Sequence, residues 1–158
     1  DRRHQRTTGR HEPMSIRLPA RAKYPIYGVL LMAWCSGITF WILRTWFGVT
    51  GEFGLEPNPW QYPVLQLHGL MAFFMMINFG VMLSGHVLPA WRARPRPLSG
   101  IVFATLLGVS IASAYLLYYL GSDHIRNMIS NVHLIVGFAL PIVLFVHIRL
   151  LQRRTRRR

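Results

Sequence analysis

The amino-acid sequence predicts an all-α protein, a four-helix transmembrane bundle with up-down-up-down topology. Hydrophobic residues make up 52% of the 158 residues, and most of them gather in four long runs. The net charge of +13 comes from basic residues that lie almost entirely outside these runs. This separation of apolar runs from charged connections is typical of a membrane protein and unlike a soluble globular domain.

Each apolar run is long enough to cross a bilayer, which takes about 20 apolar residues for about 30 Å of hydrocarbon. The runs cover residues 24–46, 64–88, 99–120 and 128–151. A basic segment precedes the first run, as in a secretory signal peptide. Such peptides have a shorter apolar region, however, so we expect the first run to be a retained membrane span.

Basic residues are concentrated on one side of the predicted membrane. Seven precede the first run, three lie between the second and third, and six lie between residue 149 and the last residue. The opposite side carries Arg44 and Arg126 against Glu52, Glu56 and Asp123. The positive-inside rule therefore places both termini in the cytoplasm, as expected for a multi-pass protein of the bacterial inner membrane.

The charge pattern also indicates which partners to expect. Basic tails beside membrane spans contact anionic lipid head groups, and we expect membrane lipids here rather than nucleic acid. The chain divides into a basic cytoplasmic tail at residues 1–23, a transmembrane domain at 24–151 and a second basic cytoplasmic tail at 152–158.

The connections between the spans differ in length. The connection at residues 48–62 is rich in Gly and Pro and ends in Trp60 and Tyr62, aromatic residues that favour the membrane interface. Its length makes it a candidate docking surface. The connections at 90–98 and 121–127 are short, so we expect consecutive spans to be antiparallel neighbours.

Four of the seven histidines lie in only two of the spans. His68 and His86 belong to the second span, and His133 and His147 belong to the fourth. Ionisable residues are costly inside membrane helices and usually serve a function within the bundle. At about 100° per residue, the 18-residue and 14-residue steps are close to whole numbers of turns, so each span carries its histidines on one face.

Parallel second and fourth spans place these histidines in two cross-helix pairs at two depths. We expect His68 to pair with His133 near the outer surface and His86 with His147 near the inner one. At 1.5 Å per residue, the pairs are about 21 to 27 Å apart. Two imidazoles from facing helices can hold haem iron as axial ligands. The sequence therefore predicts two bis-histidine haems b, since no CxxCH motif for covalent attachment is present.

Other residues near the two pairs have alternative interpretations. The Met and Phe side chains of the second span could line a porphyrin or simply pack against lipid and neighbouring helices. Arg44, Arg92 and Arg126 could pair with haem propionates or act as interfacial anchors. We expect His124 to be solvent-facing in the outer loop, Cys35 to be a small packing residue, and His4 and His11 to have no role in the site. The Met and Phe side chains are Met71, Phe73, Phe74, Met75, Met76, Phe79 and Met82.

These features resemble the membrane cytochrome b subunits of quinone-linked oxidoreductases, including the four-helix haem core of the cytochrome bc complexes. The resemblance covers roughly residues 24–151. His133 in Asn-Val-His-Leu-Ile-Val-Gly and His147 in Val-His-Ile match the 14-residue spacing of that family. His68 in Leu-His-Gly-Leu and His86 in Ser-Gly-His-Val would be their partners, although their step is four residues, or about 6 Å, longer. Helix tilt or a kink at Pro141 would absorb this difference.

The resemblance implies a membrane b-type cytochrome that transfers electrons across the bilayer. It would act as a subunit of a respiratory or photosynthetic redox complex and would not be catalytic by itself. Other redox subunits are implied partners, with quinone as a candidate cofactor and a periplasmic cytochrome c as a candidate partner. The alternative is a haem-free structural subunit that anchors a larger membrane complex. A transporter or a single copper or zinc site is less favoured, because the two pairs lie too far apart to share one ion.

Overall fold

The computed structural model describes residues 20–92 and 98–156, and within them four helical segments are long and apolar enough to span a membrane. The prediction of an all-α four-helix transmembrane bundle is confirmed. The predicted tails fall largely outside the described residues, as do His4, His11 and most of the connection at 90–98. The helical elements are α1 (Ala20–Trp46), α2 (Gln61–Met82), the π-helical turn η1 (Leu83–Val87), α3 (Leu88–Arg92), α4 (Leu98–Tyr119) and α5 (Asp123–Arg156).

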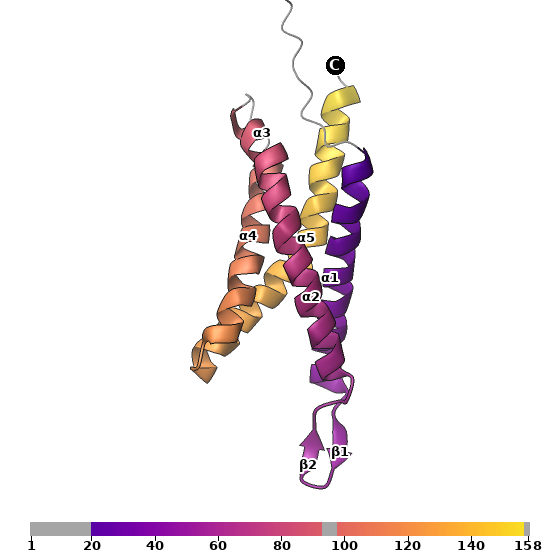
Figure 1. Cartoon of the computed structure of the whole chain (residues 1–158), viewed down its shortest axis with the longest axis vertical. Helices are drawn as coiled ribbons and strands as arrows, with labels where there is room; N and C mark the ends of the chain where they lie inside the picture. Colours follow the sequence, from indigo (N-terminus) through magenta and orange to yellow (C-terminus); the bar gives the residue numbers. More distant parts are fainter. Residues whose placement is uncertain (1–19, 93–97, 157–158) are drawn as a thin grey trace, which may run out of the picture.

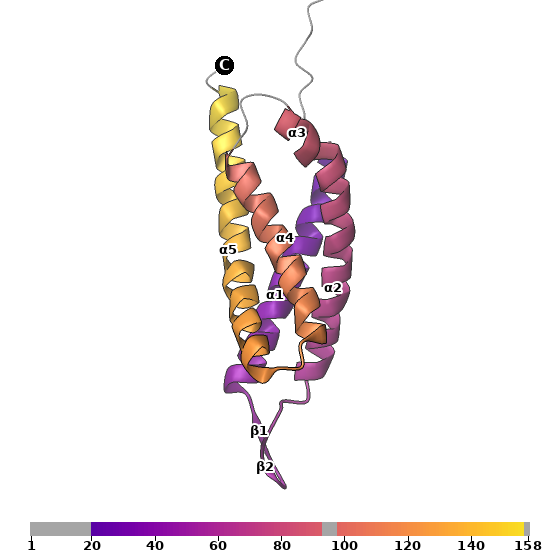
Figure 2. The same cartoon turned by 90° about the vertical axis from the view of Figure 1, so that its left-hand side faces the viewer.

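The long helices alternate in direction, as up-down-up-down topology requires. The start of α1, the short helix α3 and the end of α5 lie at one end of the bundle (Figures 1 and 2). A small β-hairpin and the turn between α4 and α5 lie at the other end. Helices α2 and α5, which carry the paired histidines, therefore run in the same direction.

The bundle consists of two helical hairpins. The first hairpin pairs α1 with α2 and the second pairs α4 with α5, each along most of its length. Contacts between the hairpins are sparser, and one of them is an edge-to-face contact of Trp41 with Phe138, with ring centroids 5.5 Å apart. Figure 1 also shows a change of direction near the middle of α5, the helix that contains Pro141.

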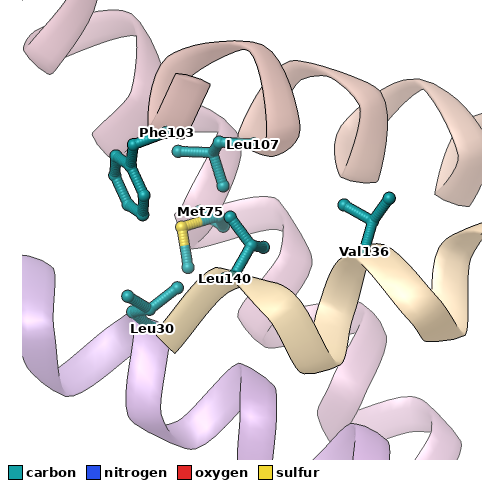
Figure 3. Packing of buried hydrophobic residues seen from close by; sticks show 6 residues of the cluster. All are labelled: Leu30, Met75, Phe103, Leu107, Val136 and Leu140. Atoms are coloured by element: carbon teal, nitrogen blue, oxygen red, sulfur yellow. The ribbon is translucent and has the colours of Figure 1, made fainter. Parts of the chain in front are cut away.

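A thin apolar core joins the hairpins at mid-height, with side chains from all four long helices (Figure 3). Leu107 and Leu140 are its most buried members, at 3% and 5% exposure. Large apolar side chains elsewhere on the helices are exposed, which suits a surface that lipid covers. The core residues are Leu30, Met75, Phe103, Leu107, Val136 and Leu140.

The connection after α1 contains structure that the sequence analysis did not anticipate. Strands β1 (Val49–Gly51) and β2 (Gly54–Glu56) form an antiparallel hairpin that projects beyond the ends of the helices (Figures 1 and 2). Gly54 has a φ of 112°, a conformation that residues with a Cβ rarely adopt. Phe53 at the tip is 96% exposed.

The last outer connection is shorter than expected. Because α5 begins at Asp123, His124 and Arg126 lie in the first turn of a helix instead of a loop. The backbone N–H of Arg126 donates to the carbonyl of Ser122 at 2.9 Å, which extends the helical hydrogen bonding to the turn. Both side chains are nevertheless exposed, as expected for His124.

The second membrane span contains the π-helical turn η1, in which the N–H of Leu88 donates to the carbonyl of Leu83, five residues earlier. Pro89 supplies a physical reason, because proline has no N–H for the carbonyl of Gly85 and its ring crowds that carbonyl. A π turn advances less per residue than an α turn. The distance along the helix axis from His68 to His86 is therefore shorter than 18 residues of ideal α-helix would give. The π turn also changes the angle between these side chains around the axis, so α-helical spacing alone does not place them on one face.

Candidate functional site

The outer pair of histidines comes together across the boundary between the two helical hairpins. His68 of α2 and His133 of α5 have ring centroids 6.1 Å apart, and their planes are nearly perpendicular, at 81°. Both side chains are half-buried. The sequence analysis expected this pairing from the parallel directions of the two helices.

The Nδ1 atom of His68 is held by α1. It lies 3.0 Å from the carbonyl oxygen of Ala33 and 3.2 Å from the hydroxyl oxygen of Ser36. The Ser36 hydroxyl itself donates to the carbonyls of Met32 and Ala33, at 2.8 and 3.0 Å. Since a carbonyl only accepts, Nδ1 carries the hydrogen and donates it.

His133 has the same arrangement on the second helical hairpin. Its Nδ1 atom lies 2.9 Å from the hydroxyl oxygen of Ser113 and 3.2 Å from the carbonyl oxygen of Ser110. The Ser113 hydroxyl donates to that same carbonyl at 3.0 Å. In both histidines the neutral ring then has its free lone pair on Nε2, which makes Nε2 the available ligand atom.

The centroid separation of the two rings leaves room for a single metal ion between them. A metal–imidazole bond of about 2 Å on each side, with about 1 Å from each ligand nitrogen to its ring centre, gives a centroid separation of about 6 Å. The centroids of His68 and His133 are 6.1 Å apart. Hydrogen-bonded Nδ1 atoms opposite the ligand atoms are also the usual arrangement for metal-binding histidines.

Gly37 gives α1 its close approach to His68. A Cβ atom at Gly37 would lie 2.8 Å from Cε1 of the His68 ring, closer than real Cβ atoms come to other atoms, and 3.2 Å from its Nδ1 atom. Any side chain there would displace the imidazole. Glycine therefore allows the backbone of α1 to pack directly against the ring edge.

The inner pair is less completely defined. His147 of α5 lies within electrostatic range of His86 in the π turn η1. Its Nδ1 atom is 2.9 Å from the hydroxyl of Ser99 in α4, and its ring stacks on Phe103 with centroids 6.5 Å apart and planes at 9°. His86 and His147 thus lie at the same inner level, one on each helical hairpin.

The apolar core separates the two levels. Met75 lies between the histidines of α2 in sequence and is buried at 7% exposure, while Phe79 and Met82 pack against the same core. Phe73 and Met76 are exposed on the outside of the bundle, at 55% and 51%. Only part of the Met and Phe stripe therefore faces the bundle interior, and the exposed part suits lipid contact.

The remaining sequence candidates lie apart from these pairs. Arg44, Arg92 and Arg126 are exposed near the ends of the helices, which suits interfacial anchoring. Among the residues described by the structure, no group of three or more His, Cys, Asp and Glu side chains could hold a metal ion. The candidate site is the outer histidine pair, with its hydrogen-bonded rings, together with the inner pair.

The sequence analysis missed the hydroxyl and carbonyl groups around the histidines. Ser36, Ser99 and Ser113 each contact an Nδ1 atom, from helices that contain no histidine among their described residues. Serines in membrane helices commonly bond to their own helix, so they carry little signal alone. The 14-residue step from Ser99 to Ser113, equal to that from His133 to His147, is the one pattern that could have indicated them.

No protein-family model, curated protein or solved structure matches this chain.

Proposed function

We propose that this chain is a membrane b-type cytochrome that carries electrons across the bilayer through two bis-histidine haems, as a subunit of a redox complex. The observation that carries the proposal is the outer pair. The ring centroids of His68 and His133 lie 6.1 Å apart in an edge-on arrangement, with both Nδ1 atoms hydrogen-bonded. Their Nε2 atoms are the ligand atoms in this proposal, and His86 with His147 holds the second haem.

The protein and the cofactor have separate roles in this function. A haem bound here would supply one-electron chemistry. The four histidines would hold its iron, the serines and carbonyls orient the rings, and the apolar helices exclude water. The core at Met75, Leu107 and Leu140 lies between the two levels and keeps them as separate sites.

The β-hairpin supports an assignment as a subunit. Phe53 and Leu55 are 96% and 84% exposed on an element that projects beyond the ends of the helices. Glu52 and Glu56 are the charged residues of this hairpin. We infer that another redox subunit or a soluble electron carrier with basic and apolar groups docks here on the outer side.

The first test of this function is haem content. Protein purified from its native membrane should show reduced b-type absorption bands and about two haems per chain by the pyridine haemochrome assay, because each histidine pair holds one haem. The chain expressed in the same host with all four site histidines replaced by alanine is the control and should contain none. Folded wild-type protein without haem would contradict the proposal and favour the structural anchor subunit.

A second prediction concerns orientation in the membrane. With basic residues concentrated beside α1, α3 and the end of α5, we expect both termini in the cytoplasm and the His68/His133 level toward the periplasm. In a chain with Cys35→Ala, new cysteines in Glu56→Cys and Ser122→Cys should react with a membrane-impermeant thiol reagent in intact cells. The cysteine of Arg92→Cys should react only after the membrane is opened. The reverse pattern would invert the order of the haems.

A further inference from the structure

Helix α4 contains no histidine, yet it contacts two of the three histidines of α5, namely His133 and His147. The hydroxyl oxygen of Ser113 lies 2.9 Å from Nδ1 of His133, and that of Ser99 lies 2.9 Å from Nδ1 of His147. Both serines and both histidines are 14 residues apart. Helices α4 and α5 are antiparallel and have the same rise per residue. Because the serines and the histidines have the same spacing, one alignment of the two helices forms both contacts.

We propose that Ser113 and Ser99 are positioning residues, through which α4 sets the ring orientation and the electron donation of both haem ligands on α5. This inference rests on the proposed function, since it concerns the same histidines. It assigns a role to a helix that carries no ligand. Ser36 on α1 has the corresponding position toward His68, so the outer iron would have a hydroxyl behind each of its two ligands.

The hydrogen bonds at the outer site predict whether the midpoint potential of the outer haem rises or falls when the serine is replaced. The Ser113 hydroxyl donates to the Ser110 carbonyl at 3.0 Å, so its oxygen accepts from the Nδ1–H of His133. An acceptor behind a ligating imidazole fixes the tautomer and raises the basicity of the ligand nitrogen. A more basic ligand favours ferric iron. Removal of the hydroxyl would leave Nδ1 only its longer contact with the Ser110 carbonyl at 3.2 Å, so the midpoint potential of that haem should rise.

Loss of the serine hydroxyl should affect the ring plane of the histidine less at the inner site than at the outer site. His147 has a second support, because its ring stacks on Phe103 at an interplanar angle of 9°. Loss of the Ser99 hydroxyl should change the donor strength of His147 while the stacked ring keeps its plane. Loss of the Ser113 hydroxyl should change both the donor strength and the ring plane of His133, for which no such stack is found among the described residues.

The test uses the haem-loaded protein in its native membrane. Ser113→Ala should shift the outer haem toward the ferrous form by about tenfold, which is about 59 mV for one electron, and leave the inner haem unchanged. Ser99→Ala should do the same for the inner haem alone. The anisotropy of the ferric EPR signal, which depends on the angle between ligand planes, should change in Ser113→Ala and not in Ser99→Ala.

Two control variants distinguish an effect of the Ser113 hydroxyl on the His133 ring from a general disturbance of helix α4. Ser110→Ala removes a hydroxyl one turn away and keeps the carbonyl that contacts His133, and Ser113→Thr keeps a hydroxyl at the site. Both should retain the wild-type potentials. Loss of the outer haem in Ser113→Ala with retention in Ser113→Thr would also support the proposal.

Other outcomes would overturn it. Unchanged potentials and EPR spectra in both alanine variants, with both haems bound, would show that the serines do not position the ligands. An equal shift of the potential in Ser110→Ala would show that the substitutions act through helix packing and not through the Ser113 hydroxyl. Loss of haem in Ser113→Thr as well as in Ser113→Ala would show the same. A wild-type chain without haem would contradict the function itself, which distinguishes the two failures.

Discussion

His68→Ala and His133→Ala should each leave the protein with one haem, and both variants should lose the same outer haem. The reason is that the centroids of the two rings lie 6.1 Å apart across the hairpin boundary, so removal of either ring would leave only one histidine to hold the outer haem. His86→Ala and His147→Ala should both lose the inner haem. Redox titration of the b-type bands, with the pyridine haemochrome assay for stoichiometry, measures which haem remains.

The control for this experiment is His124→Ala, which removes an exposed histidine from the same end of the bundle. It should retain both haems with unchanged potentials. If His68→Ala and His133→Ala abolished different haems, the pairing across the two helical hairpins would be wrong. If both retained two haems, the outer pair would not be a haem site.

Gly37→Ala should weaken haem binding at the outer site by about 10-fold to 100-fold, the range observed when the surroundings of metal ligands are changed. Its Cβ atom would lie 2.8 Å from Cε1 of His68, and the ring cannot move away without losing its contacts with Ala33 and Ser36. Haem retention during detergent washing, followed by the absorbance of the outer haem, measures the effect.

Gly28→Ala is the matched control on the same helix, because nothing lies within 4 Å of a Cβ atom there. Both substitutions bring a similar gain in helix propensity, about 1 kcal/mol in a helix interior. Only Gly37→Ala should affect the outer haem. Equal haem retention in the two variants would contradict the direct contact between α1 and the His68 ring.

The sequence predicted the four spans, their alternating directions and the outer pairing of His68 with His133. These features depend on long-range patterns, namely the length of apolar runs and the direction of consecutive helices, which a single sequence displays directly. The predicted first, second and fourth spans are shorter than the helical segments that contain them. Helix α5 begins at Asp123 and continues to Arg156, because helices extend into polar regions where apolar length gives no signal.

Features that depend on local geometry were not predictable in the same way. The strands β1 and β2 have three residues each, too few to show an alternating pattern. The π turn η1 follows from Pro89, but a proline near a helix end more often marks the end of the helix. These limits affected the inner pair most, because its expected geometry assumed an uninterrupted α-helix up to His86.

The histidines could be found from sequence because an imidazole inside a membrane span is rare. Their supporting groups could not, since a serine such as Ser36 or Ser113 is common in membrane helices and a backbone carbonyl has no sequence signature at all. Gly37 is similar, because glycine is frequent in membrane helices and only its distance to His68 distinguishes it.

The division into two helical hairpins has a consequence for assembly. Each histidine pair takes one member from the second membrane span, His68 of α2 or His86 of η1, and one from α5, so neither helical hairpin contains a complete site. Sparse direct contacts between the hairpins provide little driving force for association in lipid, where apolar surfaces gain nothing by leaving water. If the chain binds a cofactor, the two helical hairpins would insert into the membrane first, as separate units. Binding of the cofactor by histidines from both hairpins would then hold them together and complete the fold.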